Sequence, residues 1–135
     1  DPYDLDTRKI LNFGHTVGHS LESLYLALGY DDFTHGEAVA SGMICEAWIS
    51  GKLTGMPENE INQLTDLICN FFELKVVEER HYAFLSDGLK FDKKKTAHGA
   101  GYSLLEKIGK PVFGKTVDQY TLLESFNYYN SKANK

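Results

Sequence analysis

The sequence is poor in cysteine, proline and tryptophan, with two, three and one of these among its 135 residues. Two cysteines cannot build a disulfide framework. Cys45 and Cys69 stand in apolar, helix-like surroundings, where we expect reduced core thiols of a cytoplasmic protein. No run of about eighteen apolar residues occurs and no secretory leader is visible, so we expect neither a membrane span nor export.

Positive charge is also scarce: 14 Lys and Arg face 19 Asp and Glu, for a net charge of −5. The lysines do not alternate with aromatic residues in a stacking pattern, so we predict no binding to nucleic acid. Hydrophobic residues make up 42% of the chain, enough for 135 residues to bury the core of one domain.

Apolar periodicity predicts a mainly α-helical domain over residues 1–135, with a short β-hairpin near the C-terminus. The segment 35–51 is apolar on nearly every face, which indicates a buried central helix. The polar tail 130–135 should fray. The expected helices span about 5–28, 35–51, 57–71, 75–89 and from 120 onward, and the expected strands are 102–105 and 112–117.

Three histidines are the chief candidates for chemistry. His15 and His19 are four residues apart and share one helix face, while Thr34 can cap the next helix and hold His35 in its first turn. If the two helices pack antiparallel, three imidazoles meet and could begin a site for zinc or another transition metal. The alternative is that each histidine is simply solvated or hydrogen-bonded.

Two further features allow two interpretations each. Gly14 and Gly18 directly precede two of the histidines, which indicates either a ligand close to the backbone or close packing of two helices. The run Asp92 to Lys95 is either a solvated helix end or a patch that binds phosphate or carboxylate.

Three motifs in this order resemble the signatures of the 3-dehydroquinate synthase family. The first is Arg8-x-x-Leu-Asn-Phe-Gly-His-Thr-x-Gly-His19 with Glu22 three residues on, the second is Thr34-His-Gly-Glu-Ala-Val-Ala-x-Gly-Met43, and the third is Asp92-Lys-Lys followed by Ile108-Gly. The resemblance covers roughly residues 8–110. It implies the fold of that family's C-terminal helical domain, without the N-terminal NAD-binding domain.

The resemblance also implies roles for the histidines. His15 and His35 would be two ligands of a divalent metal, normally zinc, and the family's third ligand, a glutamate, would lie outside the matching stretch. His19 would stand beside the substrate and assist proton transfer. Glu37 is explained by capping, or alternatively by orienting His35.

Four more positions would bind substrate by the same resemblance. Arg8 and Asn12 would hold the carboxylate or phosphate end of the substrate, since arginine offers a planar fork to an oxyanion. Lys93 or Lys94 would add positive charge near the phosphate.

The implied activity is the phosphate-eliminating cyclisation of a seven-carbon sugar-acid phosphate to 3-dehydroquinate in the shikimate pathway of aromatic amino acid biosynthesis, with NAD and a metal as cofactors. The implied partners are this substrate, an N-terminal NAD-binding domain and, in a homodimer, a second copy. The chain alone should be an inactive part of this lyase. The alternatives are another NAD-dependent sugar-phosphate cyclase, such as a 2-deoxy-scyllo-inosose synthase, or a non-catalytic helical interaction module.

Overall fold

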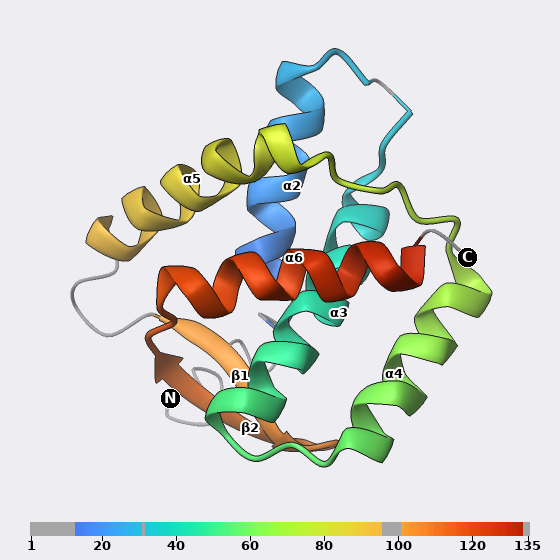
Figure 1. Cartoon of the computed structure of the whole chain (residues 1–135), viewed down its shortest axis with the longest axis vertical. Helices are drawn as coiled ribbons and strands as arrows, with labels where there is room; N and C mark the ends of the chain where they lie inside the picture. Colours follow the sequence, from blue (N-terminus) through green and yellow to red (C-terminus); the bar gives the residue numbers. More distant parts are fainter. Residues whose placement is uncertain (1–12, 31, 96–100, 134–135) are drawn as a thin grey trace, which may run out of the picture.

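The computed structural model describes residues 13–30, 32–95 and 101–133, and Figure 1 shows their arrangement. The domain is mainly helical with one β-hairpin, as the sequence predicted. The helices are α2 (His15–Ala27), α3 (His35–Leu53), α4 (Glu58–Phe71), the short 3₁₀-helix η1 (Glu79–His81), α5 (Tyr82–Lys95) and α6 (Gln119–Ala133), and the strands are β1 (Tyr102–Lys107) and β2 (Lys110–Lys115).

Helix α3 is the centre of the domain. It packs against α2, α4, α6 and β1, and in Figure 1 α6 crosses over it. Its Ile44, Ala47 and Ile49 side chains are fully buried. A helix covered on several sides needs apolar residues all round, which is the pattern of residues 35–51. The expectation of a buried central helix is therefore confirmed.

Helix α4 follows the predicted bounds, beginning directly after Pro57. It buries Ile61, Thr65 and Ile68 on one face, at the spacing of an amphipathic helix. Helix α2 covers the second half of the first expected helix, and the part of that prediction up to residue 12 lies outside the described residues.

The helix predicted over 75–89 starts later than expected. Residues 72–78 are not helical, and the chain turns through η1 before α5 begins. The reason is that the Asn130 side chain of α6 pairs with both the N–H and the C=O of Val77, at 2.8 and 2.7 Å. These bonds satisfy the Val77 backbone outside a helix.

The tail was predicted to fray from residue 130, and this is wrong as far as Ala133, where α6 ends. Besides the Asn130 contacts, buried Tyr129 donates its hydroxyl to the carbonyl of Lys75 (2.6 Å). The last turns of α6 are thus held by the segment that precedes η1.

The predicted hairpin is present, with antiparallel pairing that sets Leu104 opposite Val112. It is tied to α3, because the backbone N–H of Leu105 donates to the hydroxyl of Ser50 (2.9 Å). Among the described helices, none has the length and apolar character needed to cross a membrane.

Candidate functional site

The three histidines lie together. His15 is the first residue of α2, His19 follows one turn later, and His35 is the first residue of α3. The ring centroid of His15 is 5.6 Å from that of His19 and 5.6 Å from that of His35, and His19 and His35 are 6.0 Å apart. The packing of α2 on α3 thus brings the three imidazoles into one cluster, as the sequence predicted for an antiparallel pair.

Each of the two expected metal ligands has one ring nitrogen engaged by the protein. Nδ1 of His35 lies 3.2 and 3.3 Å from the carboxylate oxygens of Glu22, and Nδ1 of His15 lies 3.4 Å from the carbonyl of Phe13. A ring that donates through Nδ1 presents Nε2 as its metal-binding atom. Glu22 was part of the first motif but had been given no role.

The predicted cap holds His35 at the start of α3. The hydroxyl of Thr34 accepts the backbone N–H of Glu37 at 3.1 Å. The Glu37 carboxylate accepts from that same hydroxyl (3.1 Å), and the carboxylate that contacts His35 is Glu22. Glu37 therefore belongs to the cap, while Glu22 orients the ring.

Three glycines explain how close α2 and α3 come. A Cβ on Gly42 would collide with the carbonyl oxygen of Gly14 and the N–H of Gly18. A Cβ on Gly18 would lie 3.0 Å from the carbonyl oxygen of Ala38. Of the two interpretations of Gly14 and Gly18, the described residues therefore support close helix packing.

A buried carboxyl group joins the two helices beneath the histidines. Glu46 of α3 is 0% exposed and accepts the backbone N–H of Gly14 (3.0 Å) and of Val17 (2.9 Å). Burial raises the pKa of Glu46 to about 8, although both hydrogen bonds act in the opposite direction. Sequence reasoning missed this residue. The available signal was an acidic residue in the apolar middle of the helix, eleven positions and about three turns after His35.

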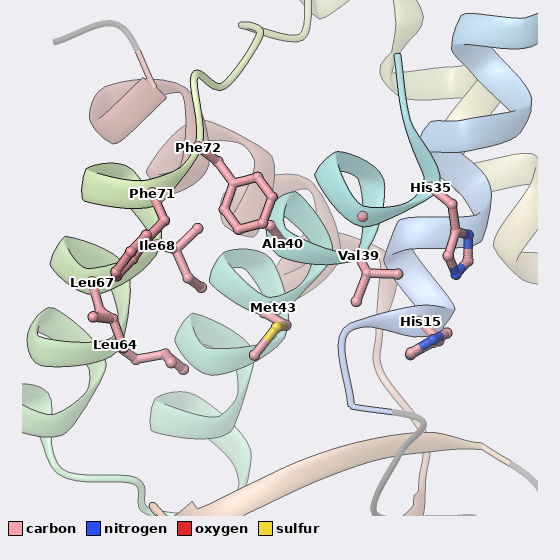
Figure 2. A pocket seen from close by; sticks show the side chains of 11 residues that line it. His15, His35, Val39, Ala40, Met43, Leu64, Leu67, Ile68, Phe71 and Phe72 are labelled. Carbon is pink, nitrogen blue, oxygen red and sulfur yellow. The ribbon is translucent and has the colours of Figure 1, made fainter.

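Beside the histidines runs an apolar groove between α3 and α4, with a volume of about 460 Å³. Figure 2 shows His15 and His35 at one end and the α4 side chains along the opposite wall. The groove is lined by His15, His35, Gly36, Val39, Ala40, Met43, Leu64, Leu67, Ile68, Phe71 and Phe72. Among the described residues that line the groove, His15 and His35 are the ones whose side chains carry polar atoms for a metal or a polar ligand.

The pair of His15 and His35 suits a metal in the type of its donors and in the separation of its two rings. A metal about 2.0–2.1 Å from one nitrogen of each ring would set the two centroids roughly 5–6 Å apart. The 5.6 Å between His15 and His35 falls in this range. No group of three or more potential ligands is assembled among the described residues. His15 and His35 thus fit as a partial ligand set.

The four expected substrate-binding residues are not located by the structure. Arg8 and Asn12 lie outside the described residues. Lys93 and Lys94 fall in the last turn of α5, but their side chains are likewise outside the described part. Their roles stay predictions.

Comparison with known proteins matches residues 1–95 to a family model described as the 3-dehydroquinate synthase C-terminal domain. Two curated relatives are named 3-dehydroquinate synthase. The protein from Parabacteroides distasonis is 33% identical over 96% of this chain, and that from Methylacidiphilum infernorum is 36% identical over 82%. The chain spans 36% and 30% of their respective lengths, about a third of each.

Solved structures with a similar fold are longer too. A 2-deoxy-scyllo-inosose synthase complexed with carbaglucose-6-phosphate, NAD+ and Co2+ gives a TM-score of 0.69 at 25% identity, over 88% of this chain and 33% of its own. A 2-epi-5-epi-valiolone synthase from Streptomyces hygroscopicus with NAD+ and Zn2+ bound gives 0.72 at 20% identity, over 90% and 32%. The second likeness is one of fold alone.

Proposed function

We propose that this chain, which belongs to the 3-dehydroquinate synthase C-terminal domain family, carries the metal-binding and proton-transfer half of a 3-dehydroquinate synthase. The full protein would convert a seven-carbon sugar-acid phosphate to 3-dehydroquinate with loss of phosphate. The observation that carries the proposal is the convergence of His15, His19 and His35 from two helices within 5.6–6.0 Å of one another.

Each histidine has a distinct task in this proposal. Nε2 of His15 and Nε2 of His35 would bind the metal, because the Nδ1 atoms are engaged by Phe13 and Glu22. His19 is exposed and its ring lies near the rings of His15 and His35, which supports our assignment of proton transfer on a metal-bound substrate to His19. The metal would supply Lewis acidity and NAD the hydride chemistry.

The rest of the machinery would come from the part of the protein that corresponds to the other two thirds of the relatives. We assign NAD binding and a third, acidic metal ligand to that part. Arg8, Asn12 and one of Lys93 and Lys94 would hold the phosphate and carboxylate of the substrate. The chain by itself should accordingly show no turnover and only weak zinc binding, since two imidazoles leave half of a four-coordinate shell to water.

A second candidate is a cyclase that acts on another sugar phosphate. It is favoured by the solved 2-deoxy-scyllo-inosose synthase, whose complex holds a carba analogue of glucose 6-phosphate. The curated relatives named 3-dehydroquinate synthase, with identities of 33% and 36%, favour the first candidate.

The test is phosphate release by the full-length protein with NAD and zinc, measured separately with three substrates. These are the seven-carbon 3-deoxy-heptulosonate 7-phosphate, glucose 6-phosphate and sedoheptulose 7-phosphate. We expect turnover of the first alone, abolished by His15→Ala and by His19→Ala and retained by His81→Ala. Turnover of another substrate would move the protein to a neighbouring cyclase. No turnover of any would support the helical interaction module.

A further inference from the structure

Helix α2 begins without a cap of its own. Its N-cap residue is Gly14, with φ of +85°, and the space where a side chain would stand is filled by Met43 and the Val39 carbonyl. The first N–H groups of a helix have no partner within the helix and need acceptors. Close packing against α3 therefore forbids the usual capping side chain at the place where it is required.

Glu46 supplies both acceptors from the other helix. In a capping box, one side chain accepts the N–H of the third helical residue and a second accepts the N–H of the N-cap residue. Here the N-cap is Gly14 and the third helical residue is Val17. Oε1 of Glu46 accepts the N–H of Gly14 (3.0 Å), and Oε2 of Glu46 accepts the N–H of Val17 (2.9 Å).

These two bonds bracket His15, which is the first residue of α2. On α3, residues 35, 42 and 46 are spaced by seven and four positions, so they follow one face of the helix. That face packs against α2. Gly42 and Glu46 make the contact in the middle of α3, and His35 makes it at the start of α3 through Glu22. The helix that presents His35 thus also fixes the backbone that presents His15.

We propose that Glu46 is a positioning residue for the histidine cluster, because its two carboxyl oxygens hold the start of α2 on α3 and so fix His15 relative to His35. This inference rests on the proposed function for its consequence, metal binding. The geometry itself is independent of that function. The two hydrogen bonds of Glu46 go to the backbone of Gly14 and Val17 and not to an imidazole ring, and Glu46 is not among the residues that line the groove.

The test uses the full-length protein with Glu46→Gln, which keeps the size of the side chain but turns an N–H₂ group toward one of the two backbone donors. Two quantities are measured: Co2+ affinity by optical titration and hydrogen exchange of the Gly14 and Val17 amides. We expect Co2+ binding to weaken about 10- to 100-fold, the range for groups that orient metal ligands. Exchange of the two amides should rise at least tenfold.

Two variants separate positioning from stability. Glu60 also accepts a backbone N–H from a distant part of the chain, that of Ile108 at 2.8 Å, but it is not among the residues that line the groove. Glu60→Gln should leave Co2+ affinity within twofold. Ile49 of α3 is fully buried, so Ile49→Val should lower the free energy of unfolding, and it should likewise leave Co2+ affinity within twofold.

Glu46→Asp keeps both acceptor oxygens, so it tests the positioning role of residue 46 if the Gln variant does not fold. We expect it to restore part of the amide protection and of the Co2+ affinity. The proposal would be overturned if the Gln or the Asp variant lost stability but kept the Co2+ affinity, as Ile49→Val is expected to do. Unchanged exchange of the Gly14 and Val17 amides in the Gln variant would overturn it as well. Failure of the wild-type protein to bind Co2+ would instead count against the proposed function, and the amide exchange would still test the positioning role.

Discussion

Gly42 is the residue on which the approach of α2 to α3 depends. A Cβ at this position would collide with the Gly14 carbonyl oxygen and the Gly18 N–H, both backbone atoms that cannot move aside. We predict that Gly42→Ala lowers the free energy of unfolding by about 1–3 kcal/mol, the usual cost of overpacking. Urea denaturation measures it.

Gly88 of α5 is the matched control, since a Cβ there would meet only the Ser20 hydroxyl at 3.5 Å, an ordinary contact. Gly88→Ala should stabilise the protein by up to about 1 kcal/mol through helix propensity. Equal effects of the two substitutions would contradict the packing described here.

Glu22 should control metal affinity through His35. Its carboxylate lies 3.2 Å from Nδ1 of His35, and loss of such a partner typically costs 10- to 100-fold in metal affinity. We expect Glu22→Ala to weaken Zn2+ binding by about that factor. Glu37→Ala serves as control, because the Glu37 carboxylate bonds to the Thr34 hydroxyl. Competition with a chromophoric chelator measures the Zn2+ affinity of both variants. A larger loss of affinity in Glu37→Ala than in Glu22→Ala would reverse the roles assigned to the two residues.

Glu46 should give stability a characteristic pH dependence. Its pKa rises from 4.5 to about 8 on folding, chiefly through burial. Between pH 4.5 and about pH 8, Glu46 keeps its proton in the folded protein but has lost it in the unfolded chain. The contribution of Glu46 to the free energy of unfolding is therefore largest below pH 4.5 and decreases as the pH rises toward about 8.

The comparison of wild type with Glu46→Gln isolates this contribution. The free energy of unfolding, measured by urea titration, should decrease more from pH 5 to pH 8 for the wild type than for the Gln variant. Parallel pH profiles of the two proteins would contradict a raised pKa of Glu46.

Sequence patterns anticipated the histidines but not the carboxyl groups that hold them. His15 and His19 were found because a four-residue spacing on a helix is visible in the chain, and His35 because Thr34 marks a helix start. The partners Glu22 and Glu46 act across the α2–α3 contact. Which residues face each other there depends on the packing register, which no local pattern records.

At the level of whole elements, the segment before η1 is held by α6 and not by its own helical bonds. Asn130 donates to the Val77 carbonyl and accepts the Val77 N–H. We predict that Asn130→Asp destabilises the protein by about 1–3 kcal/mol, because a carboxylate cannot donate and would face the carbonyl oxygen. Thermal unfolding measures the loss.

Asn127 offers a control on the same helix. It is exposed and accepts the Tyr82 hydroxyl through its side-chain oxygen, which Asp would retain. Asn127→Asp should therefore change stability little. The Asn130 contacts also explain the misplaced helix start at residue 75. Val76 and Val77 favour a helix only weakly, and the distant Asn130 side chain decided the conformation of this segment.

On the scale of the whole molecule, the helical architecture followed from periodicity because α2, α4 and α6 each pack a face against α3, and α5 packs against α2 and α6. Element types and order were predictable, including the hairpin and the central helix. The boundaries that failed, near residues 75 and 130, both lie where Asn130 and Tyr129 join segments far apart in the chain. The chain spans about a third of its curated relatives, so its activity is a property we assign to a longer protein.

The most direct test of the central claim is a Co2+ titration of the full-length protein, followed by optical absorption, with each histidine replaced in turn. We predict that His15→Ala and His35→Ala each weaken Co2+ binding by more than about tenfold, since each removes a ligand that is harder to replace than an orienting group. His81→Ala, a change in η1, should leave binding unaltered. Equal Co2+ affinity in wild type and in the His15 and His35 variants would contradict the metal site and, with it, the assignment of this chain to the chemistry of a cyclase.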